Sequence, residues 1–167
     1  MRAFIGLGGN LGDRALSLMR ARRLVTLAST DAAHARASSI FESEPIGELS
    51  QPPFLNAVLS IETTLAPIAI LDWLLRVEQT LGRVRDGVRG PRVIDLDLLA
   101  VDGTVLNSAR LRLPHPEISN RRFVLEPFCE VAPDWIHPVL GKPVVELLDA
   151  LPAAPWVRRL GDIWWEC

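Results

Sequence analysis

An alternating run in the first half of the chain, FLNAVLSIET at residues 54–63, places the tightest constraint on what this sequence can fold into. One face of the run carries Leu55, Ala57, Leu59 and Ile61, and the other carries Phe54, Asn56, Val58 and Ser60. A period of two is typical of a β-strand, because successive side chains point to opposite faces. The run therefore predicts a strand with an aliphatic core face, and it places Phe54 and Asn56 together on the other face.

Two amphipathic helices are predicted, one before and one after this strand. The first follows Asn10, which we expect to cap it, and the second covers residues 66–81 and ends at Gly82. Their apolar stripes are Leu18, Ala21, Val25 and Ala28 in the first helix, and Ile70, Leu74, Val77 and Leu81 in the second. Spacings of three and four residues put each stripe on one side of its helix, so both helices can pack on a sheet.

The remaining elements complete a recognisable order. Further strands are predicted at residues 2–7, 35–43 and 93–101. Asp102 and Gly103 predict a hairpin turn to a neighbouring strand. The order β-α-β-β-α-β is typical of a ferredoxin-like α+β sandwich. Additional C-terminal elements are expected, namely helices near residues 121–129 and 143–150 and an edge strand in RRLGDIWWEC.

Composition and charge narrow the class of protein. With 167 residues, 49% of them hydrophobic, we expect residues 1–167 to form a single domain. The formal net charge of -2 argues against a general binder of nucleic acid or of an anionic membrane surface. No apolar run approaches the ~20 residues needed to cross a bilayer, and the start MRAFIGLGGN lacks signal-peptide features, so we expect a cytosolic protein. Cys129 and Cys167 have neither metal-ligand spacing nor a disulfide framework.

The glycine-rich stretch IGLGGNLGDR, residues 5–14, follows a predicted strand and precedes a helix, as a phosphate-binding loop does. Its spacing is different from such a loop. The G-x-G-x-x-G fingerprint counted from Gly6 requires glycine at position 11, which is Leu11, and no Gly-Lys-Ser/Thr follows. We therefore interpret the stretch as a tight turn leading into a helix.

The segment GPRVIDLDLL, residues 90–99, combines acidic residues with a strand pattern. Asp95 and Asp97 are two positions apart, so their carboxylates project from the same strand face with Cα atoms about 7 Å apart. Two such carboxylates repel each other unless a cation compensates them, so the pair predicts a Mg²⁺ site whose ions bridge phosphate oxygens. A solvated polar strand face is the alternative, and Asp-x-Asp alone also occurs in glycosyltransferases and nucleases.

Arginines concentrate just before these carboxylates. Arg83, Arg85, Arg89 and Arg92 lie in a glycine-containing segment that has a single acid, Asp86. This composition is typical of a loop that grips and covers a small polyanion. His115, held between two prolines in LPHPE, is a candidate phosphate donor or proton carrier, with a structural role as the alternative.

Together these motifs resemble the 6-hydroxymethyl-7,8-dihydropterin pyrophosphokinases of folate biosynthesis. The resemblance covers residues 1–135 and rests on GLGGNLGDR, ESEPIG, QPPFLNAVLSIET, LLRVEQTLGRVR, GPRVIDLDLL and LRLPHPEISNRRFVLEPFCEVAP. It implies a ferredoxin-like fold and transfer of pyrophosphate from ATP to the pterin hydroxymethyl oxygen, with release of AMP. It also implies two Mg²⁺ ions, with ATP and hydroxymethyl dihydropterin as small-molecule partners. We expect a monomer without a nucleic-acid or membrane partner, and whether another folate enzyme is a physical partner stays open.

The resemblance also implies roles for particular residues. Asp95 and Asp97 would bind the two Mg²⁺ ions, and Arg83 and Arg92 would grip the triphosphate; these four are the expected catalytic residues. The other residues expected to bind ATP are Glu78, Arg85, Leu98, Arg110, His115 and Arg121. The residues expected to bind the pterin are Ser43, Pro45, Ile46, Phe54, Asn56, Asp95 and Phe123. The two phenylalanine rings would stack on the heterocycle, and Asn56 would read its edge.

One segment departs from the family pattern. The loop DGVRGPR is one residue shorter than is common, and it lacks the tryptophan often found before Gly-Pro-Arg. This change favours one alternative, a non-catalytic relative that binds pterin or nucleotide. A two-metal nucleotidyltransferase or nuclease is a further alternative, against which the acidic charge balance argues.

Overall fold

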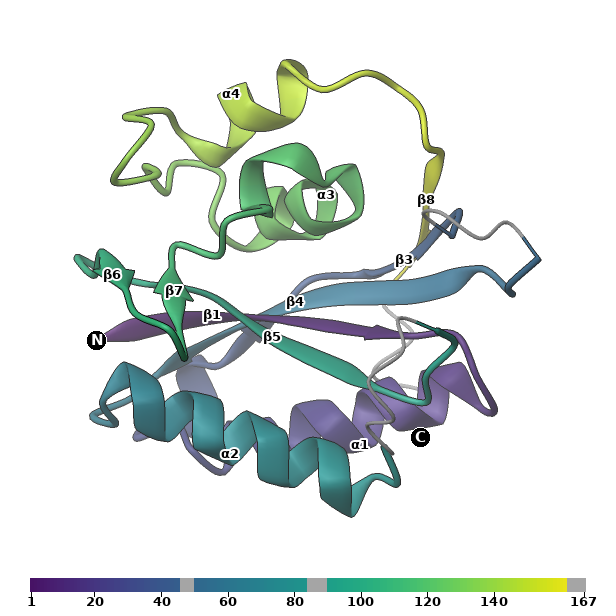
Figure 1. The fold of residues 1–167 in the computed structure, drawn as a ribbon, viewed down its shortest axis with the longest axis horizontal. Helices are drawn as coiled ribbons and strands as arrows, with labels where there is room; N and C mark the ends of the chain where they lie inside the picture. Colours follow the sequence, from purple (N-terminus) through teal and green to yellow (C-terminus); the bar gives the residue numbers. More distant parts are fainter. Residues whose placement is uncertain (46–49, 84–89, 162–167) are drawn as a thin grey trace.

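The computed structural model describes residues 1–45, 50–83 and 90–161 (Figure 1). The strands are β1 (Arg2–Gly9), β2 (Arg36–Ala37), β3 (Ile40–Ser43), β4 (Phe54–Glu62), β5 (Asp95–Val101), β6 (Leu106–Asn107), β7 (Arg112–Leu113) and β8 (Val157–Gly161). The α-helices are α1 (Arg14–Thr26), α2 (Pro67–Thr80), α3 (Arg122–Val131) and α4 (Val144–Asp149), and the short 3-10 helices are η1 (Ala32–His34) and η2 (Ile118–Asn120).

Within the described segments, the main sheet has six strands in the order β5-β1-β4-β3-β8, with β2 also paired to β4. Neighbouring strands are antiparallel throughout this sheet. If β2 and β3 are counted as one interrupted strand, the order from β5 to β3 is the strand order of the predicted β-α-β-β-α-β arrangement. The prediction of a ferredoxin-like α+β fold is therefore confirmed. In the segment of the predicted edge strand, β8 lies at the edge of the sheet, and residues 162–167 lie outside the described residues.

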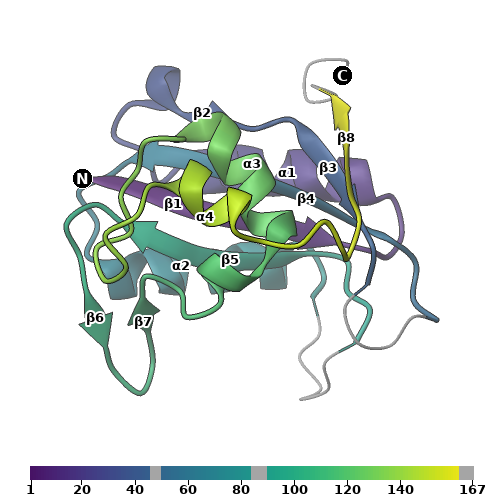
Figure 2. The ribbon, with the colours of Figure 1, turned by 90° about the horizontal axis from the view of Figure 1, so that it is seen from above.

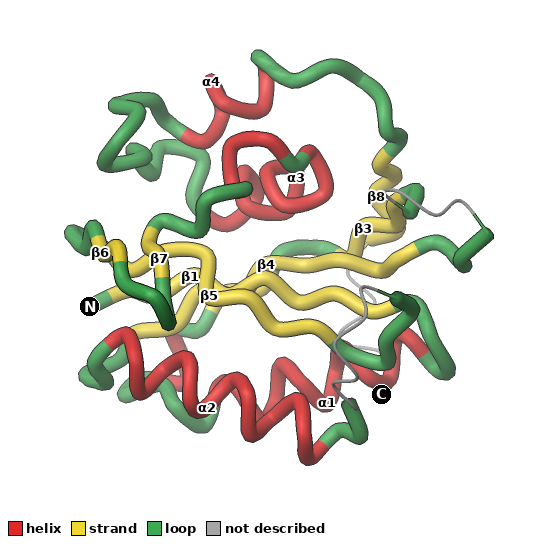
Figure 3. Tube along the Cα trace, viewed as in Figure 1, coloured by secondary structure: helices red, strands yellow, loops and turns green. Residues whose placement is uncertain are grey.

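Helices cover both faces of this sheet. Helices α1 and α2 lie on one face, and α3 and α4 lie on the other (Figure 1, Figure 3). From above, α3 lies over the strands, and the β6–β7 ribbon extends to one side of them (Figure 2). A sheet covered on both faces needs apolar residues on both, which explains why β4 is buried along nearly its whole length.

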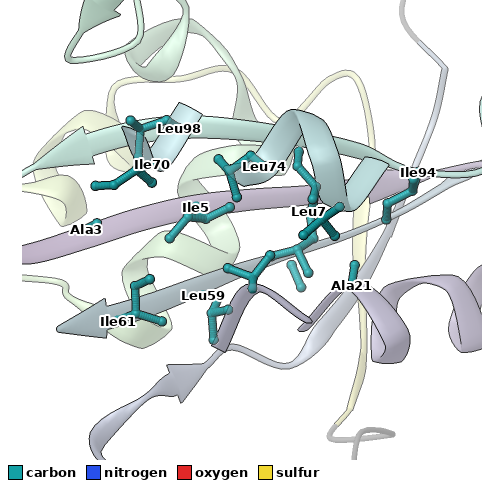
Figure 4. Packing of buried hydrophobic residues seen from close by; sticks show 14 of the residues in the cluster. Ala3, Ile5, Leu7, Ala21, Leu59, Ile61, Ile70, Leu74, Ile94 and Leu98 are labelled. Carbon is teal, nitrogen blue, oxygen red and sulfur yellow. The ribbon is translucent and has the colours of Figure 1, made fainter. Parts of the chain in front are cut away.

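The core under α1 and α2 is the one that the sequence patterns predicted. In the predicted helix stripes, Leu18, Ala21, Ile70 and Leu74 are fully buried, whereas the last residue of each stripe, Ala28 and Leu81, is partly buried. They pack against aliphatic residues of the sheet, Ile5, Leu7, Leu59, Ile61 and Leu98 among them (Figure 4). Burying each such side chain contributes about 1.5–3 kcal/mol, so this layer holds both helices on the sheet.

The second core, on the opposite face, is aromatic. The ring centroids of Phe4 and Phe128 are 4.7 Å apart, and those of Phe128 and Trp135 are 5.3 Å apart. Val58, on the other face of β4 from Leu59, belongs to this cluster. The two cores confirm the predicted alternation of β4.

The predicted cap of the first helix is wrong. The N-cap is Asp13, whose carboxylate accepts a hydrogen bond from Leu16 N at 3.0 Å. Asn10 instead contacts Arg92, Gln51 and Pro52. Asp13 directly precedes α1, so its carboxylate can reach the free N–H groups of the first turn, which Asn10, three residues earlier, does not reach. The side chain of Asn10 is then available for long-range contacts.

The predicted hairpin after β5 is also wrong. Thr104 N donates to Val101 O at 3.0 Å, which closes a turn at Gly103, but β6 then pairs with β7 instead of with β5. Asp102 receives hydrogen bonds from Arg2 Nε at 3.2 Å and Trp135 Nε1 at 3.1 Å. These long-range contacts direct the chain away from β5. The Asp-Gly pair indicates only a local turn and carries no information about such contacts.

The strand predicted over residues 35–43 is interrupted at Ser38 and Ser39. Val58 N donates to Ser38 Oγ at 3.0 Å, and Ser39 N donates to Glu130 Oε2 at 2.7 Å. Side-chain oxygens thus replace ladder partners at this position, as at a bulge. The interruption separates β2 from β3 and ties the strand to α3.

Candidate active site

The acidic pair lies at the start of β5. Asp95 is paired across the sheet with Gly8 of β1, and Asp97 is paired with Gly6. The intervening Leu96 is buried in the core under α1 and α2. The structure therefore confirms that both carboxylates occupy the face opposite that core, and each has a glycine as its neighbour on β1.

Asp95 is held by two of the predicted arginines. Arg83 forms ion pairs with both Asp95 and Glu78, and Arg92 Nη1 lies 3.1 Å from Asp95 Oδ2. Glu78 is buried in α2 and also accepts a hydrogen bond from Leu96 N at 2.8 Å. Burial lowers the pKa of Arg83, but the carboxylates of Asp95 and Glu78 outweigh burial and raise it. Glu78 of α2 therefore holds both the Arg83 side chain and the start of β5 in place.

Asp97 has a different environment. Burial raises the pKa of Asp97, and the neighbouring Asp95 carboxylate raises it further, whereas His115, Arg121 and Arg92 oppose the rise. The ionised carboxylate is thus disfavoured by burial and by one neighbouring negative charge, and favoured by the charges of two arginines and a histidine. Such a position suits a group that contacts a cation or a polar ligand.

A large cavity of about 490 Å³ lies on one side of Asp97. Its walls come from α2, β5 and the segment from Ser108 to Pro116; the lining residues include Leu71, Leu75, Leu98, Arg110, Arg112 and His115. The cavity thus combines apolar walls with cationic residues at its rim. Three residues predicted to bind ATP, Leu98, Arg110 and His115, are brought together here.

Asp97 also lines a second, smaller pocket. It is lined by Gly6, Gly8, Asn56, Asp95, Phe123 and Val124 among others. Asn56 Nδ2 donates to Ser43 Oγ at 2.8 Å, and both side chains are buried. Three residues predicted to bind the pterin, Asn56, Asp95 and Phe123, therefore line this pocket, and Ser43 supports Asn56 from behind. Asp97 lines both the pocket and the larger cavity.

Other predicted residues lie near the site without lining either hollow. Phe54 begins β4, and the Arg92 guanidinium carbon is 5.7 Å from its ring centroid. Arg121 lies similarly over Phe123, at 5.8 Å. Pro45 is buried beside the end of β3. The predicted residues Ile46 and Arg85 lie outside the described residues, as does Arg89.

We expected the glycines of the stretch at residues 5–14 to let the chain pass close beneath the pterin side of the site, and Gly6 and Gly8 do line the small pocket. Two other features of the site were missed from the sequence. Arg112 lines the large cavity, two positions after the predicted Arg110. Asn10 bonds to segments on both sides of the site, and no local pattern indicates such contacts.

The acidic pair offers a metal ion few protein ligands. In the described segments, no cluster of three or more histidine, cysteine, aspartate and glutamate residues is arranged to hold a metal ion. Two carboxylates remain, which suits Mg²⁺, because this ion keeps several waters and takes few protein ligands. Arg92 Nε, buried and without a hydrogen-bond partner in the described part of the chain, is a donor suited to an anionic ligand in the same place.

None of the helices in the described part of the chain is both long and apolar enough to cross a membrane. This finding agrees with the lack of long apolar runs in the sequence.

Comparison with solved structures shows the fold. A crystal structure of Plasmodium falciparum HPPK-DHPS matches 89% of this chain with a TM-score of 0.68 and 14% sequence identity. The chain spans 42% of that longer protein. The likeness at this identity concerns the fold alone.

Comparison with known sequences shows the family. A protein from Methylorubrum extorquens named 2-amino-4-hydroxy-6-hydroxymethyldihydropteridine pyrophosphokinase is 42% identical over 90% of this chain and 93% of its own length. A protein of the same name from Synechocystis is 36% identical over 96% of this chain and 85% of its own length. The family model described as 7,8-dihydro-6-hydroxymethylpterin-pyrophosphokinase (HPPK) matches residues 4–133. The chain therefore belongs to the HPPK family.

Proposed function

We propose that this chain transfers pyrophosphate from ATP to 6-hydroxymethyl-7,8-dihydropterin, producing AMP and the pterin diphosphate for folate biosynthesis. The family match over residues 4–133 and the names of the similar proteins support this activity. In the reaction, the pterin hydroxymethyl oxygen forms a bond to the β-phosphorus of ATP. The bond from that phosphorus to the oxygen of the α-phosphate breaks, and AMP leaves.

The observation that carries the proposal is that Asp97 lines two neighbouring hollows of different chemistry. The large cavity, with Arg110 and His115, has the volume and the cationic rim that a nucleotide needs. The small pocket, with Asn56 and Phe123, has a ring and an amide suited to a flat heterocycle with hydrogen-bonding edges. Two substrates bound in these two hollows would meet at the carboxylates.

On the ATP side, we assign the phosphates to the cationic residues near the acidic pair. Arg83 and Arg92, which pair with Asp95, would stabilise charge on the transferring group, and the charges of His115 and Arg121 act on the neighbouring Asp97. The remaining proposed ATP-binding residues are Glu78, Arg85, Leu98 and Arg110. Glu78 is buried beneath Arg83, so its proposed contribution is to orient that arginine.

On the pterin side, we assign the stacking contacts to Phe54 and Phe123 and the edge contacts to Asn56. Ser43 accepts from Asn56 Nδ2, which fixes the amide so that the rest of the group can face the heterocycle. Pro45 and Ile46 complete the proposed pocket. Gly6 and Gly8 line the same pocket, and a Cβ at Gly8 would lie 3.4 Å from Asn56 Oδ1, so glycine there keeps the amide uncrowded.

We propose that Asp95 and Asp97 hold two Mg²⁺ ions together with the phosphates of ATP. The fit rests on two carboxylates that share a strand face and repel each other, with glycines opposite them on β1. When bound, such ions neutralise phosphate charge and lower the pKa of the attacking hydroxyl. The protein residues align the substrates, keep Asp95 in place through two arginines and exclude water at the buried floor.

Product identification tests the activity. Purified protein is incubated with ATP, Mg²⁺ and hydroxymethyl dihydropterin, and the nucleotide products are separated by chromatography. We expect AMP in equal amount to the pterin diphosphate. Formation of ADP would contradict pyrophosphoryl transfer. Tight binding of both substrates without AMP would instead favour the non-catalytic relative that the short arginine loop left open.

The nuclease alternative has less support. No third acidic residue joins the pair within the described segments, and two-metal nucleases usually use one. The predictions of a monomer, of a cytosolic location and of one domain over residues 1–167 stay predictions.

A further inference from the structure

We propose that Asn10 is a positioning residue that couples the pterin side of the site to the phosphate side. The inference rests on the proposed function, because it assigns a task to the segments that flank the two substrates. Asn10 lies in the turn between β1 and α1, and its side chain is buried, with the residue 2% exposed. It was expected to cap a helix, but Asp13 performs that task.

The side chain of Asn10 uses both ends of its amide. Its Oδ1 accepts a hydrogen bond from Arg92 N at 2.8 Å. Its Nδ2 donates to Pro52 O and to Gln51 Oε1, each at 3.2 Å. Because a backbone N–H requires an acceptor and a carbonyl requires a donor, the amide has one orientation that satisfies both sides. Asn10 is therefore a two-sided link between residues 51–52 and Arg92.

The backbone of the same turn strengthens the Arg92 side. Asn10 N and Leu11 N both donate to Arg92 O, at 2.9 and 3.2 Å. At Gly9, a Cβ would come within 2.5 Å of Val93 O, so the two segments are in direct backbone contact. This contact requires glycine at position 9 and leaves little freedom for Arg92 relative to Asn10.

A second side chain from the turn reaches the other segment. Arg14 Nη1 donates to Pro53 O at 2.7 Å, and the same atom lies 3.2 Å from Glu42 Oε1. Three successive residues, 51–53, are thus hydrogen-bonded to the β1–α1 connection. Asn10 binds Gln51 and Pro52, and Arg14, the first residue of α1, binds Pro53.

The two linked segments lead directly to proposed substrate contacts. Pro53 precedes Phe54, a proposed pterin-stacking ring, and Arg92 pairs with Asp95. The Arg92 guanidinium also lies near the Phe54 ring. A shift of Arg92 on binding triphosphate would therefore be transmitted through Asn10 to the segment that positions Phe54. The free energies of binding of the two substrates are then coupled, and by linkage the coupling is reciprocal.

The test compares Asn10→Asp with the wild type. The aspartate keeps an acceptor for Arg92 N but replaces the donor, so a carboxylate oxygen faces Pro52 O and the pterin-side link is lost. Calorimetry measures the pterin Kd with and without Mg²⁺ and a non-hydrolysable ATP analogue. We expect the analogue to tighten pterin binding to the wild type by about tenfold, and to do so by less than about twofold in Asn10→Asp. The Kd of the analogue alone should change little.

Controls separate a positioning role from a loss of folding. Asn107→Asp makes the same chemical change at an exposed position of β6 and should retain wild-type coupling. Gln51→Ala removes only one of the two Nδ2 contacts and should reduce the coupling partly. Thermal unfolding of each variant checks that the fold is intact, and Asn10→Ser is used if the aspartate variant does not fold.

Failure of the Asn10 proposal can be told apart from failure of the proposed activity. If the wild type forms AMP but the analogue leaves its pterin Kd unchanged, or if Asn10→Asp and Asn10→Ser couple as the wild type does, the positioning role is overturned. In turnover assays we expect the loss in kcat/KM for the pterin to exceed the loss for ATP. If the wild type forms no AMP at all, the proposed activity fails, and the binding measurement still decides whether Asn10 links the two sides.

Discussion

At the residue scale, Asp97 is placed where its charge lowers the stability of the folded protein. Burial and the adjacent Asp95 carboxylate both disfavour the charge on Asp97, as its raised pKa indicates. A group of this kind destabilises the folded protein when it is ionised and nothing compensates its charge. Arg83 and Arg92 both form ion pairs with Asp95, and these ion pairs compensate the charge of that carboxylate. The uncompensated repulsion therefore falls mainly on Asp97.

Replacement of Asp97 by asparagine should separate stability from activity. The variant keeps the shape of the side chain but removes its repulsion with Asp95, so we expect a higher Tm than that of the wild type in metal-free buffer. The rate of AMP formation should fall by about 10²–10³-fold, because a charge that the reaction requires is missing. Differential scanning calorimetry and the product assay measure the two effects. Asp134→Asn, at an exposed position, is the matched control, and an Asp97→Asn enzyme with wild-type turnover would remove Asp97 from the catalytic residues.

At the scale of elements, the connection between α3 and α4 is organised around one buried histidine. His137 Nδ1 accepts hydrogen bonds from Leu140 N at 3.2 Å and Val139 N at 3.3 Å. The ring also meets Trp135 edge-on, with centroids 5.8 Å apart. Accepting at Nδ1 requires that this nitrogen carry no proton, and burial lowers the pKa of His137 below its ordinary value of 6.5. The helix connection therefore depends on the neutral imidazole.

This dependence predicts a loss of stability in mild acid. In the unfolded chain His137 binds a proton near pH 6.5, and in the folded chain it does so only at lower pH, so protons favour unfolding in this window. The contribution is complete above pH 6.5 and is lost as pH falls through the lowered pKa of the folded state. Urea unfolding between pH 5 and pH 8 should show a shallower pH dependence for His137→Gln than for the wild type.

An exposed valine in the same connection provides the comparison. Val139→Ala changes a side chain at a residue that is 64% exposed and keeps the backbone N–H that donates to His137, so it should keep the wild-type pH dependence. Parallel curves for the wild type and His137→Gln would contradict the assigned role of the buried ring.

At the scale of the whole molecule, the site joins segments that are far apart in the chain. The acidic pair comes from β5, the large cavity adds α2 and the segment through His115, and the small pocket adds β1, β4 and the start of α3. No single element holds enough of the site to bind a substrate. Ligand binding should therefore require the folded state and should stabilise it as a whole.

Substrate protection tests this assembly together with the metal. A non-hydrolysable ATP analogue with Mg²⁺, at about 100 times its Kd, should add about 2.7 kcal/mol to the free energy of unfolding. For a chain of this size we expect Tm to rise by about 2–4 °C for each kcal/mol. EDTA should remove most of the shift, and the double variant Asp95→Asn/Asp97→Asn should show little of it. A full shift in the presence of EDTA would contradict the Mg²⁺ assignment.

Local patterns in the sequence were sufficient for most of the fold. The alternation of β4 and the stripes through Leu18 and Ile70 reflect which side of an element meets the core, and that information is local. The shared face of Asp95 and Asp97 follows from the same period of two, so the acidic pair was also predictable. The motifs that resemble the HPPK family then supplied the grouping of ATP and pterin residues.

Contacts between distant segments decided the rest. The local sequence predicts a helix cap at Asn10, but its side chain binds Arg92 and Pro52. It also predicts a hairpin at Asp102 and Gly103, but Asp102 is held by Arg2 and Trp135. A polar side chain is directed by whichever partner the folded chain brings within about 3 Å, and that partner need not be near in sequence. The sequence by itself determined the elements and the chemistry of the acidic pair, and only the tertiary structure decided which segments those polar side chains join.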